Sequence, residues 1–183
     1  MLKNEQLAPL DTRHESWPDQ VFDALIAAQV KHVVYVPDTG HAQLIERAHD
    51  DTRLEVTVLT TEEEGIGLLT GAWLGGERGV LLMQSSGVGN CINTLSLIKN
   101  CRIPFLTLVT MRGDWAEFNP WQNAMANATA PSLKLMGVMT RYVDQPDDIA
   151  EVVSAAADMV FNGDEAMAIL ISQRMIGRKE WSK

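Results

Sequence analysis

Three consecutive glutamates at positions 62–64 lead into a glycine-rich apolar stretch that continues to residue 73. If a helix begins near Thr61 and turns by about 100° per residue, its apolar residues share one broad face. The members of that face are Ile66, Leu68, Leu69, Ala72 and Trp73. Glu62 falls beside the face, whereas Glu63 and Glu64 point away from it. Because an unpaired buried charge is costly, Glu62 is expected to have a partner, a raised pKa or a chemical role, and a solvated acidic first turn is the alternative.

Small, polar and charged residues gather where four predicted strands end. The four segments are Pro37–His41, Thr60–Glu62, Gln84–Asn90 and Thr110–Trp115. Ligands of open parallel sheets bind at the carboxyl ends of the strands, so these segments are candidate site loops. The two glycines in Gln84–Asn90 precede a predicted helix and could present backbone N–H groups to an anion. A tight strand-to-helix turn explains the segment equally well, because it lacks the full glycine pattern of dinucleotide binders and the lysine of a P-loop.

Single side chains in these segments have both a chemical and a structural interpretation. His41 could act as a general acid or base or donate an N–H to a substrate, or it could be a polar residue in the first turn of a helix. Arg112 could pair with a carboxylate or sulfonate, whereas a surface ion pair is the alternative. Three aromatic residues, Trp115, Phe118 and Trp121, lie in an irregular segment. They could line a pocket or contact a partner, and burial by another chain is favoured over exposure to solvent.

Apolar runs alternate along the chain with segments of helical periodicity. Strands are expected at residues 32–36, 54–59, 79–83, 104–109, 140–143 and 166–171, and helices from Ser16 as cap, at 41–49, from 61, at 90–99 and at 147–161. Nearly continuous apolar strands are typical of a covered parallel sheet, so we predict a Rossmann-like open parallel α/β sheet of about six strands with helices on both faces. Between residues 111 and 131 the pattern lapses, and we expect a long functional or disordered loop.

Length and charge set limits on the architecture and the partners. The 183 residues suit one domain, which we place at residues 14–173, between an N-terminal extension at 1–13 and a polar C-terminal tail at 174–183. The formal net charge of −9 argues against nucleic acid or an anionic membrane as a partner. Cys91 and Cys101 match no zinc or redox spacing, so we expect free thiols in a reducing compartment. The polar N-terminus is unlike a signal peptide or a membrane span, which favours a cytoplasmic protein.

Taken together, these segments resemble the pyrimidine-binding domain of thiamine-diphosphate-dependent 2-oxo acid decarboxylases. The resemblance is closest to the alpha subunit of sulfopyruvate decarboxylase, with phosphonopyruvate decarboxylase a near relative. It is carried by Val36–Thr39, by Glu62–Gly71, by Met83–Asn90 and by Met111–Asp114, and it extends from about Trp17 to Ile171. The Met83–Asn90 motif is the most specific of the four.

The resemblance implies roles for particular residues. In that family a glutamate hydrogen-bonds the aminopyrimidine ring of thiamine diphosphate and so promotes removal of the thiazolium C2 proton. Aligning the family's glycine with Gly71 assigns this role to Glu62, whereas sliding the match by one residue assigns it to Glu63. The cofactor-binding residues implied are Glu62, Glu63, Gln84, Ser85, Ser86 and Gly87, and the substrate-binding residues are Asp38, Thr39, His41, Arg112 and Gln122.

Two departures from the family pattern bear on partner and substrate. The Gly-Asp-Gly run and paired asparagines that hold magnesium and diphosphate are missing here. The resemblance therefore implies a thiamine diphosphate shared with a diphosphate-binding beta subunit that binds the Mg²⁺, no metal site in this chain, and self-association as a dimer or higher. The family's Gln-His pair in the long loop is replaced by Trp121-Gln122-Asn123, which leaves the substrate open.

The expected function is that of an alpha subunit that, with its partner, converts 3-sulfopyruvate to sulfoacetaldehyde and CO₂, a step of coenzyme M biosynthesis. An alternative substrate is phosphonopyruvate or another small anionic 2-oxo acid. An alternative of a different class is a non-catalytic anion- or nucleotide-binding α/β regulatory domain that uses the turn at Gly87–Gly89.

Overall fold

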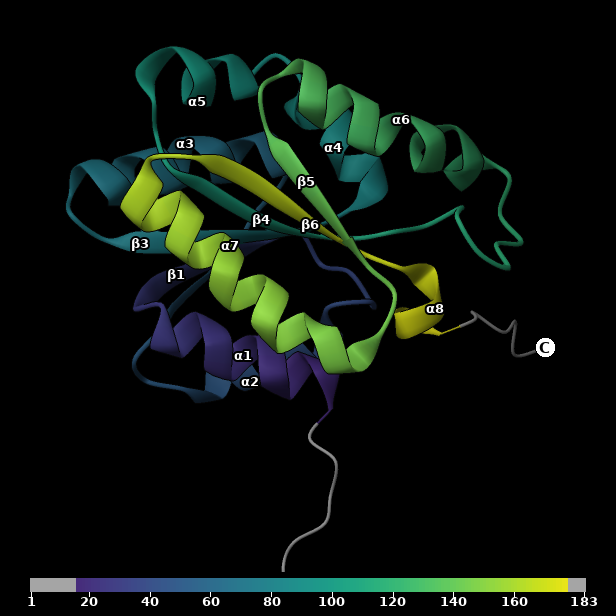
Figure 1. Ribbon diagram of the computed structural model, residues 1–183, viewed down its shortest axis with the longest axis horizontal. Coiled ribbons are helices and arrows are strands. Elements are labelled where there is room, and N and C mark those ends of the chain that lie inside the picture. The colour runs from purple at the N-terminus through teal and green to yellow at the C-terminus, as the bar shows by residue number, and fades with distance from the viewer. Residues whose placement is uncertain (1–15, 178–183) are drawn as a thin grey trace, which may run out of the picture.

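The computed structural model describes residues 16–177, which form one open sheet of six parallel strands with helices on both faces (Figure 1). The strands are β1 (Val30–Tyr35), β2 (Glu55–Val58), β3 (Arg78–Gln84), β4 (Phe105–Thr110), β5 (Met139–Val143) and β6 (Ala166–Ile171). Their order across the sheet is β2-β1-β3-β4-β6-β5. The Rossmann-like architecture expected from the sequence is confirmed.

The two layers of helices explain why the central strands are apolar throughout. Helices α1 (Trp17–Ala27), α2 (Ala42–Asp50) and α7 (Ile149–Gly163) cover one face, and α3 (Glu62–Leu74), α4 (Ser85–Cys91), α5 (Leu95–Cys101) and α6 (Trp121–Leu135) cover the other (Figure 1). Every residue of β4 and β6 is buried between them. Strands enclosed on both faces cannot alternate apolar and polar residues, so they read as continuous apolar runs.

The segment after β3 differs from the sequence-based expectation. The helix expected at 90–99 begins instead at Ser85, directly after the strand, and is interrupted between α4 and α5. Gly87 and Gly89 therefore lie inside a helix and not in a loop. Glycine costs up to about 1 kcal/mol against alanine in a helix interior, which is why the pair suggested a turn. Packing overrides this propensity, because Gly87 faces a side chain of α3.

The expected loop at 111–131 is also too long. The irregular segment ends at Pro120, and α6 continues through Pro131 to Leu135. Alanine occupies every second position from 124 to 130, and alanine is the strongest helix former. Thr129 and Leu133 are buried against the rest of the layer. The asparagines and the proline suggested a loop, but this packing favours a helix.

The described chain also extends past the domain boundary expected at residue 173. A short helix, α8 (Gln173–Ile176), follows β6, and Met175 and Ile176 pack against the core beneath α1 and α7. The remaining short element is a 3-10 helix at Pro146–Asp148. The N-terminal extension at 1–13 and the last six residues of the tail lie outside the described residues.

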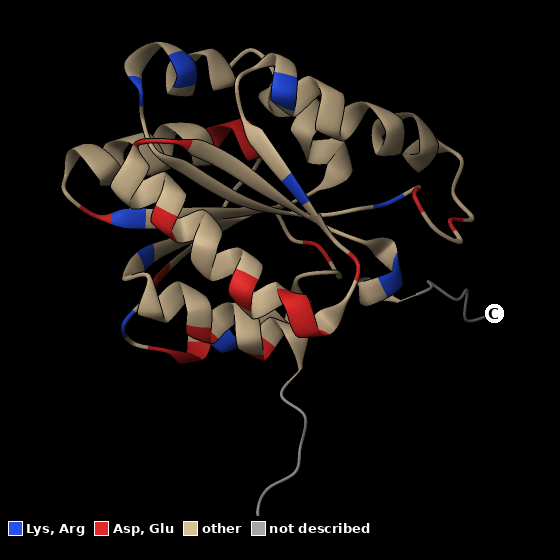
Figure 2. Cartoon of the chain, viewed as in Figure 1, with Lys and Arg blue, Asp and Glu red and all other residues tan. Residues whose placement is uncertain are grey.

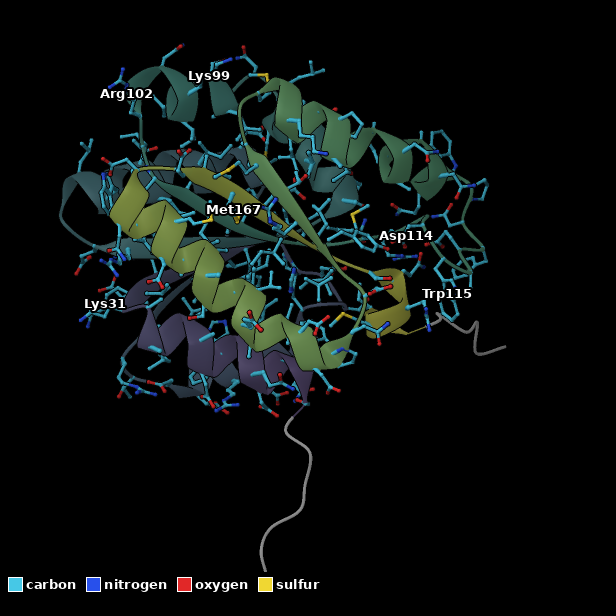
Figure 3. All side chains as sticks on the ribbon, in the orientation of Figure 1. Lys31, Lys99, Arg102, Asp114, Trp115 and Met167 are labelled. Carbon is cyan, nitrogen blue, oxygen red and sulfur yellow. The ribbon has the colours of Figure 1, made fainter. Side chains whose placement is uncertain are left out.

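Three further features concern the start of α1, the residues after β4 and the lengths of the helices. Ser16 occupies the cap position of α1, although its hydroxyl donates to Asp19 Oδ2 at 2.5 Å and caps no backbone N–H. Asp114 and Trp115 follow β4 at the carboxyl edge of the sheet, far from Lys31 near the start of β1 (Figure 3). No helix between residues 16 and 177 has the length and apolarity needed to cross a bilayer.

Candidate active site

Glu62 is the first residue of α3, and its carboxylate is buried where α3 meets α4. The residue is 8% exposed, and Asn90 Nδ2 donates a hydrogen bond to its Oε2 at 2.8 Å. On the other side of the carboxylate, a methyl group at Gly87 would overlap Oε1. Helix periodicity in the sequence predicted this inward orientation. The side chain is thus buried and oriented, with one oxygen beside a glycine.

The next two glutamates have different surroundings. Glu63 is half-buried, and its Oε2 is enclosed with no hydrogen-bond partner among the described residues. Glu64 is exposed and accepts the backbone N–H of Thr60 at 2.9 Å. The solvated first turn considered from the sequence therefore describes Glu64 well, while Glu63 remains an alternative to Glu62.

Cys91 reports on the electrostatics beside these carboxylates. Burial, and then the negative charges of Glu62 and Glu63, raise the pKa of the Cys91 thiol to about 12. The thiol is therefore neutral near pH 7 and adds no further charge. A desolvated, negative environment of this kind favours a ligand group that donates a hydrogen bond or carries positive charge.

The segment after β1 is tied to the end of β4. Asp38 Oδ2 accepts hydrogen bonds from Thr110 Oγ1 at 2.6 Å and from the backbone N–H of Gly40 at 3.1 Å. Thr39, between them, is exposed. The Asp38–Thr110 hydrogen bond joins the ends of β1 and β4, which β3 separates in the sheet. It therefore fixes the position of the β1 loop relative to β4.

His41 lies at the start of α2 and is fully buried. Its Nε2 donates to the backbone carbonyl of Leu108 at 3.1 Å, and burial lowers its pKa. The imidazole is therefore neutral with the proton on Nε2, and its Nδ1 has no partner among the described residues. In this position the ring supports the loop from within and does not face solvent.

Arg112 forms a buried ion pair within the loop that follows β4. Its Nε and Nη2 donate to the two carboxylate oxygens of Glu117 at 2.8 and 3.0 Å, and the Glu117 side chain is 2% exposed. Burial raises the pKa of Glu117, but hydrogen bonds from Arg112, the backbone of Asn119 and Gln173, with the charge of Arg112, lower it to about 2. The loop is thus closed around a charged pair, which differs from the exposed pair considered from the sequence.

Gln173 of α8 completes this cluster. Its Nε2 donates to Glu117 Oε2 at 2.9 Å, and its Oε1 accepts the backbone N–H groups of Gly113 and Trp115 at 3.0 and 3.3 Å. Gly113 has a φ of +83°, and a side chain there would collide with the backbone of Gln122. The hydrogen bonds of Gln173 therefore hold the loop in place, and its turn at Gly113 requires a residue without a side chain.

The predicted residues of β3, α4 and α6 meet beside this loop. Gln84 Nε2 donates to Ser86 Oγ at 2.6 Å and to Gln122 Oε1 at 3.4 Å. Ser85 is buried, and its Oγ accepts the backbone N–H of Arg112 at 3.1 Å. Residues that are far apart in the sequence thus converge at the carboxyl edge of the sheet.

An open pocket of about 430 Å³ lies on the other side of the β1 loop. Its lining residues are Tyr35, Pro37, Asp38, Thr39, Ala42, Ile45 and Glu46. Of the predicted site residues, Asp38 and Thr39 line this pocket, whereas Glu62, Gln84 and Gln122 do not. Among residues 16–177, no three His, Cys, Asp or Glu side chains are arranged to hold a metal ion.

Three residues of this edge escaped the sequence analysis as individuals. Asn90 belongs to a recognised motif, and its position three residues after Gly87 in a helix would have placed both on one face. Glu117 follows Arg112 by five residues, a spacing with no pattern of its own in a loop. Gln173 lies 56 residues from Glu117, so no local signal could connect them.

The aromatic residues of the loop region are partly or fully at the surface. Trp115 is 43% exposed, and Trp121, the first residue of α6, is 88% exposed. Trp115 stands beside α8, at the edge where the strands end (Figure 3). Large exposed apolar side chains are candidate positions for contact with another molecule.

Relatives of known name match most of this chain. It is 34% identical over 154 residues to the sulfopyruvate decarboxylase subunit alpha of Methanococcus maripaludis, covering 84% of this chain and 92% of the relative. The corresponding subunit of Methanothermobacter thermautotrophicus is 30% identical over 154 residues, covering 84% and 93%. A phosphonopyruvate decarboxylase of Streptomyces viridochromogenes is 34% identical over 130 residues, which cover 70% of this chain but 32% of that protein.

Comparison of folds agrees with the architecture. A 2-oxoglutarate:ferredoxin oxidoreductase of Magnetococcus marinus superposes with a TM-score of 0.68 at 11% identity, covering 90% of this chain and 31% of that one. No family model matches the sequence. Two relatives at 30% identity or more are matched over nearly their whole length, and the chain therefore belongs to the sulfopyruvate decarboxylase alpha-subunit family.

Proposed function

We propose that this chain is the alpha subunit of a decarboxylase that converts 3-sulfopyruvate to sulfoacetaldehyde and CO₂ with thiamine diphosphate. Membership of the family supports the reaction. Within the structure, the observation that carries the proposal is the Glu62 carboxylate, which is buried at the start of α3 and oriented by Asn90. A carboxylate held in this way can act on a ligand without first reorganising.

The residues around Glu62 fit the aminopyrimidine half of this cofactor. Thiamine diphosphate, when bound, supplies the nucleophilic carbon and the electron sink on which a 2-oxo acid loses CO₂. Glu62 would share one proton with the ring nitrogen at Oε1, donating the hydrogen bond when the carboxyl group holds the proton and accepting it when the ring does. The desolvation that raises the pKa of Cys91 would strengthen that bond, because water is excluded from it. Gln84, Ser85 and Ser86 would contact the same ring from the end of β3.

The substrate would lie between this edge and the β1 loop. Thr39 and Gln122 present polar groups there, and Asp38 is oriented by Thr110. The ion pair of Arg112 uses Nε and Nη2, so Nη1 is the nitrogen through which Arg112 would meet an anionic group. His41, enclosed and neutral, would position the loop and would not contact the acid itself.

The relatives are named as subunits, which supports a second polypeptide in the active assembly. In the proposal, that partner is a beta subunit that binds the diphosphate and Mg²⁺ and covers the start of α3. The layer of α4, α5 and α6 offers a face of low charge: α4 has no charged residue, and α5 and α6 carry one lysine each (Figure 2). Depletion of charge is a property of the cores of protein interfaces.

The test is reconstitution. The chain is co-expressed with candidate beta subunits, the complex is purified, and CO₂ release is measured with thiamine diphosphate, Mg²⁺ and a panel of 3-sulfopyruvate, phosphonopyruvate and pyruvate. We expect turnover of sulfopyruvate by the complex and none by either chain alone. Robust activity of this chain without a partner, or no activity of any complex, would contradict the proposal.

Phosphonopyruvate is the second candidate substrate, because two phosphonopyruvate decarboxylases match 70% and 80% of this chain. Phosphonate carries more negative charge than sulfonate near neutral pH, so the ratio of kcat/KM for the two acids separates these candidates. A non-catalytic anion-binding domain would show neither reaction and would bind phosphate or nucleotide without a partner.

A further inference from the structure

We propose that α4 positions the Glu62 carboxylate from two sides, with Asn90 as the donor to one oxygen and Gly87 as the space that the other oxygen requires. This inference rests on the proposed function, because it assigns a purpose to the orientation of Glu62. Neither residue needs to touch the reacting atoms. Both are positioning residues that act through Glu62.

The geometry of α4 brings the two contacts to one face. Gly87 and Asn90 are three residues apart in the helix, so both point toward the start of α3. Asn90 Nδ2 lies 2.8 Å from Glu62 Oε2, while a Cβ on Gly87 would collide with Oε1, Cδ and Cγ of Glu62. A glutamate has three rotatable side-chain bonds, and these two contacts select one orientation of its carboxylate.

The amide of Asn90 orients Glu62 by a hydrogen bond and forms no ion pair with it. A neutral donor orients a carboxylate without neutralising it, whereas a cation would hold the proton affinity of the group low. Among the described residues, the titratable groups that act together with Glu62 here are the Cys91 thiol of α4 and the Glu63 carboxylate of α3, because both glutamates raise the pKa of that thiol. None of these is a cation, so Glu62 keeps its capacity to accept a hydrogen bond at Oε1.

Gly87 and Gly89 provide a matched pair of variants in the same helix. In the enzyme assembled with its partner, Gly87→Ala should displace the carboxylate and lower kcat by about 10²-fold, the usual loss when one preorganised group is misplaced. The thermal midpoint should stay close to that of the wild type, because the obstructing atoms belong to a side chain that can rotate away. Gly89→Ala should keep wild-type kcat, since its nearest neighbour is Met125 Sδ at 3.5 Å.

Asn90 is tested with an isosteric change and a truncation. Asn90→Asp keeps the shape of the side chain but places a second carboxyl group against Glu62, and two adjacent carboxylates cannot easily both ionise. At low pH the introduced acid is protonated and can still donate. The ratio of variant to wild-type kcat should therefore fall by about tenfold or more as the pH rises from about 5 to 8.

Asn90→Ala removes the donor without adding a charge, so its kcat should be about tenfold lower at every pH, in line with the loss of one hydrogen bond to a charged group. Asn162→Ala, at an exposed asparagine of α7 on the opposite face of the sheet, is the control and should resemble the wild type. A pH-independent ratio for Asn90→Asp would contradict the role of Asn90 as donor.

Crystal structures of the assembled variants separate this inference from the proposed function. Glu62 should adopt a different rotamer in Gly87→Ala and should lose its fixed partner in Asn90→Ala, whatever the substrate. Unchanged positions of Glu62 in both would overturn the inference. If the variants move Glu62 but the wild-type assembly decarboxylates no 2-oxo acid, the positioning stands and the proposed function fails; if Glu62→Gln is inactive while Gly87→Ala and Asn90→Ala remain fully active, only the positioning fails.

Discussion

Glu62 and Glu117 are both buried carboxylates at the carboxyl edge of the sheet, yet their surroundings are opposite. Glu117 accepts hydrogen bonds from two nitrogens of Arg112, from Gln173 and from the backbone of Asn119, and its pKa is lowered to about 2. Within residues 16–177, Glu62 accepts one hydrogen bond, from the neutral amide of Asn90 to one of its oxygens. The oxygens of Glu117 are thus already paired with donors inside the chain, whereas Glu62 can still accept further hydrogen bonds.

Burial by itself therefore does not distinguish a reactive carboxylate from a structural one. What distinguishes them is the number and charge of the donors that are already fixed around the group. By this criterion the Arg112–Glu117–Gln173 cluster holds a loop, and in the proposed function the Glu62–Gly87–Asn90 contact presents a group to a ligand.

The largest effect is expected at Glu62. Glu62→Gln, assembled with the partner, should keep the fold but lose about 10²–10⁴ in kcat, because an amide cannot accept and return the proton that the cofactor ring requires. Steady-state decarboxylation and a melting curve measure the two quantities. Glu63→Gln is the control for alignment: if it is the inactive variant and Glu62→Gln is active, the role belongs to Glu63.

The next effect concerns the stability of the loop. Arg112→Ala would leave the Glu117 carboxylate buried without its cation, and the free energy of unfolding should fall by about 3–5 kcal/mol, as for other broken buried pairs. Urea denaturation of the assembled enzyme and of the chain measures the loss. Arg112→Lys keeps a charge but not the two-point geometry, so it should fall between the alanine variant and the wild type.

Glu117 should also contribute to the decrease in the free energy of unfolding at acid pH. Its pKa in the folded chain is about 2, below the ordinary value of 4.5, so its contribution is present above pH 4.5 and is lost as the pH falls toward 2. In a Glu117→Gln variant, that part of the acid dependence should be absent. Equal slopes for the two proteins between these pH values would show that Glu117 does not titrate as an ion-paired group.

The two cysteines give a smaller and more local readout. Burial and the charges of Glu62 and Glu63 keep Cys91 as a thiol, whereas Cys101 is exposed. At pH 8, iodoacetamide should label Cys101 alone, as peptide mass spectrometry can establish. Glu62→Gln removes one of the charges that raise the Cys91 pKa, so labelling of Cys91 should begin at a lower pH in that variant.

The smallest effect is expected at Glu64. Its carboxylate accepts the Thr60 N–H from an exposed position, so Glu64→Gln should lower the free energy of unfolding by only about 0.3–1 kcal/mol and leave kcat unchanged. A large loss of activity in this variant would mean that the acidic turn acts as a unit and that the division between the glutamates is wrong.

The sequence predicted those parts of the molecule that depend on local periodicity. All six strands were placed within a few residues, because strands enclosed on both faces are continuous apolar runs. The inward direction of Glu62 followed from the helical repeat in the same way. These signals are local, since each depends on residues within one element.

The missed features depend on contacts between distant residues. Gly87 leaves inside α4 the space that Glu62 needs, and Asn90 lies 28 positions from the same glutamate. The helix at 121–135 is favoured by its packing against α4, although its asparagines and Pro131 suggest a loop. No window of sequence contains both partners of such a contact, so propensity alone gave the wrong boundary.

The strand order has a consequence for the time at which the chain acquires its structure during synthesis. β5 pairs only with β6, which is made later, so residues 139–143 have no neighbour in the sheet until the ribosome has completed residues 166–171. Gln173 follows immediately and fixes the loop at 112–117. The β5–β6 pairing and the Gln173 contacts can therefore form only late in synthesis, and a nascent chain that stalls before β6 would expose an unfinished sheet edge to other chains.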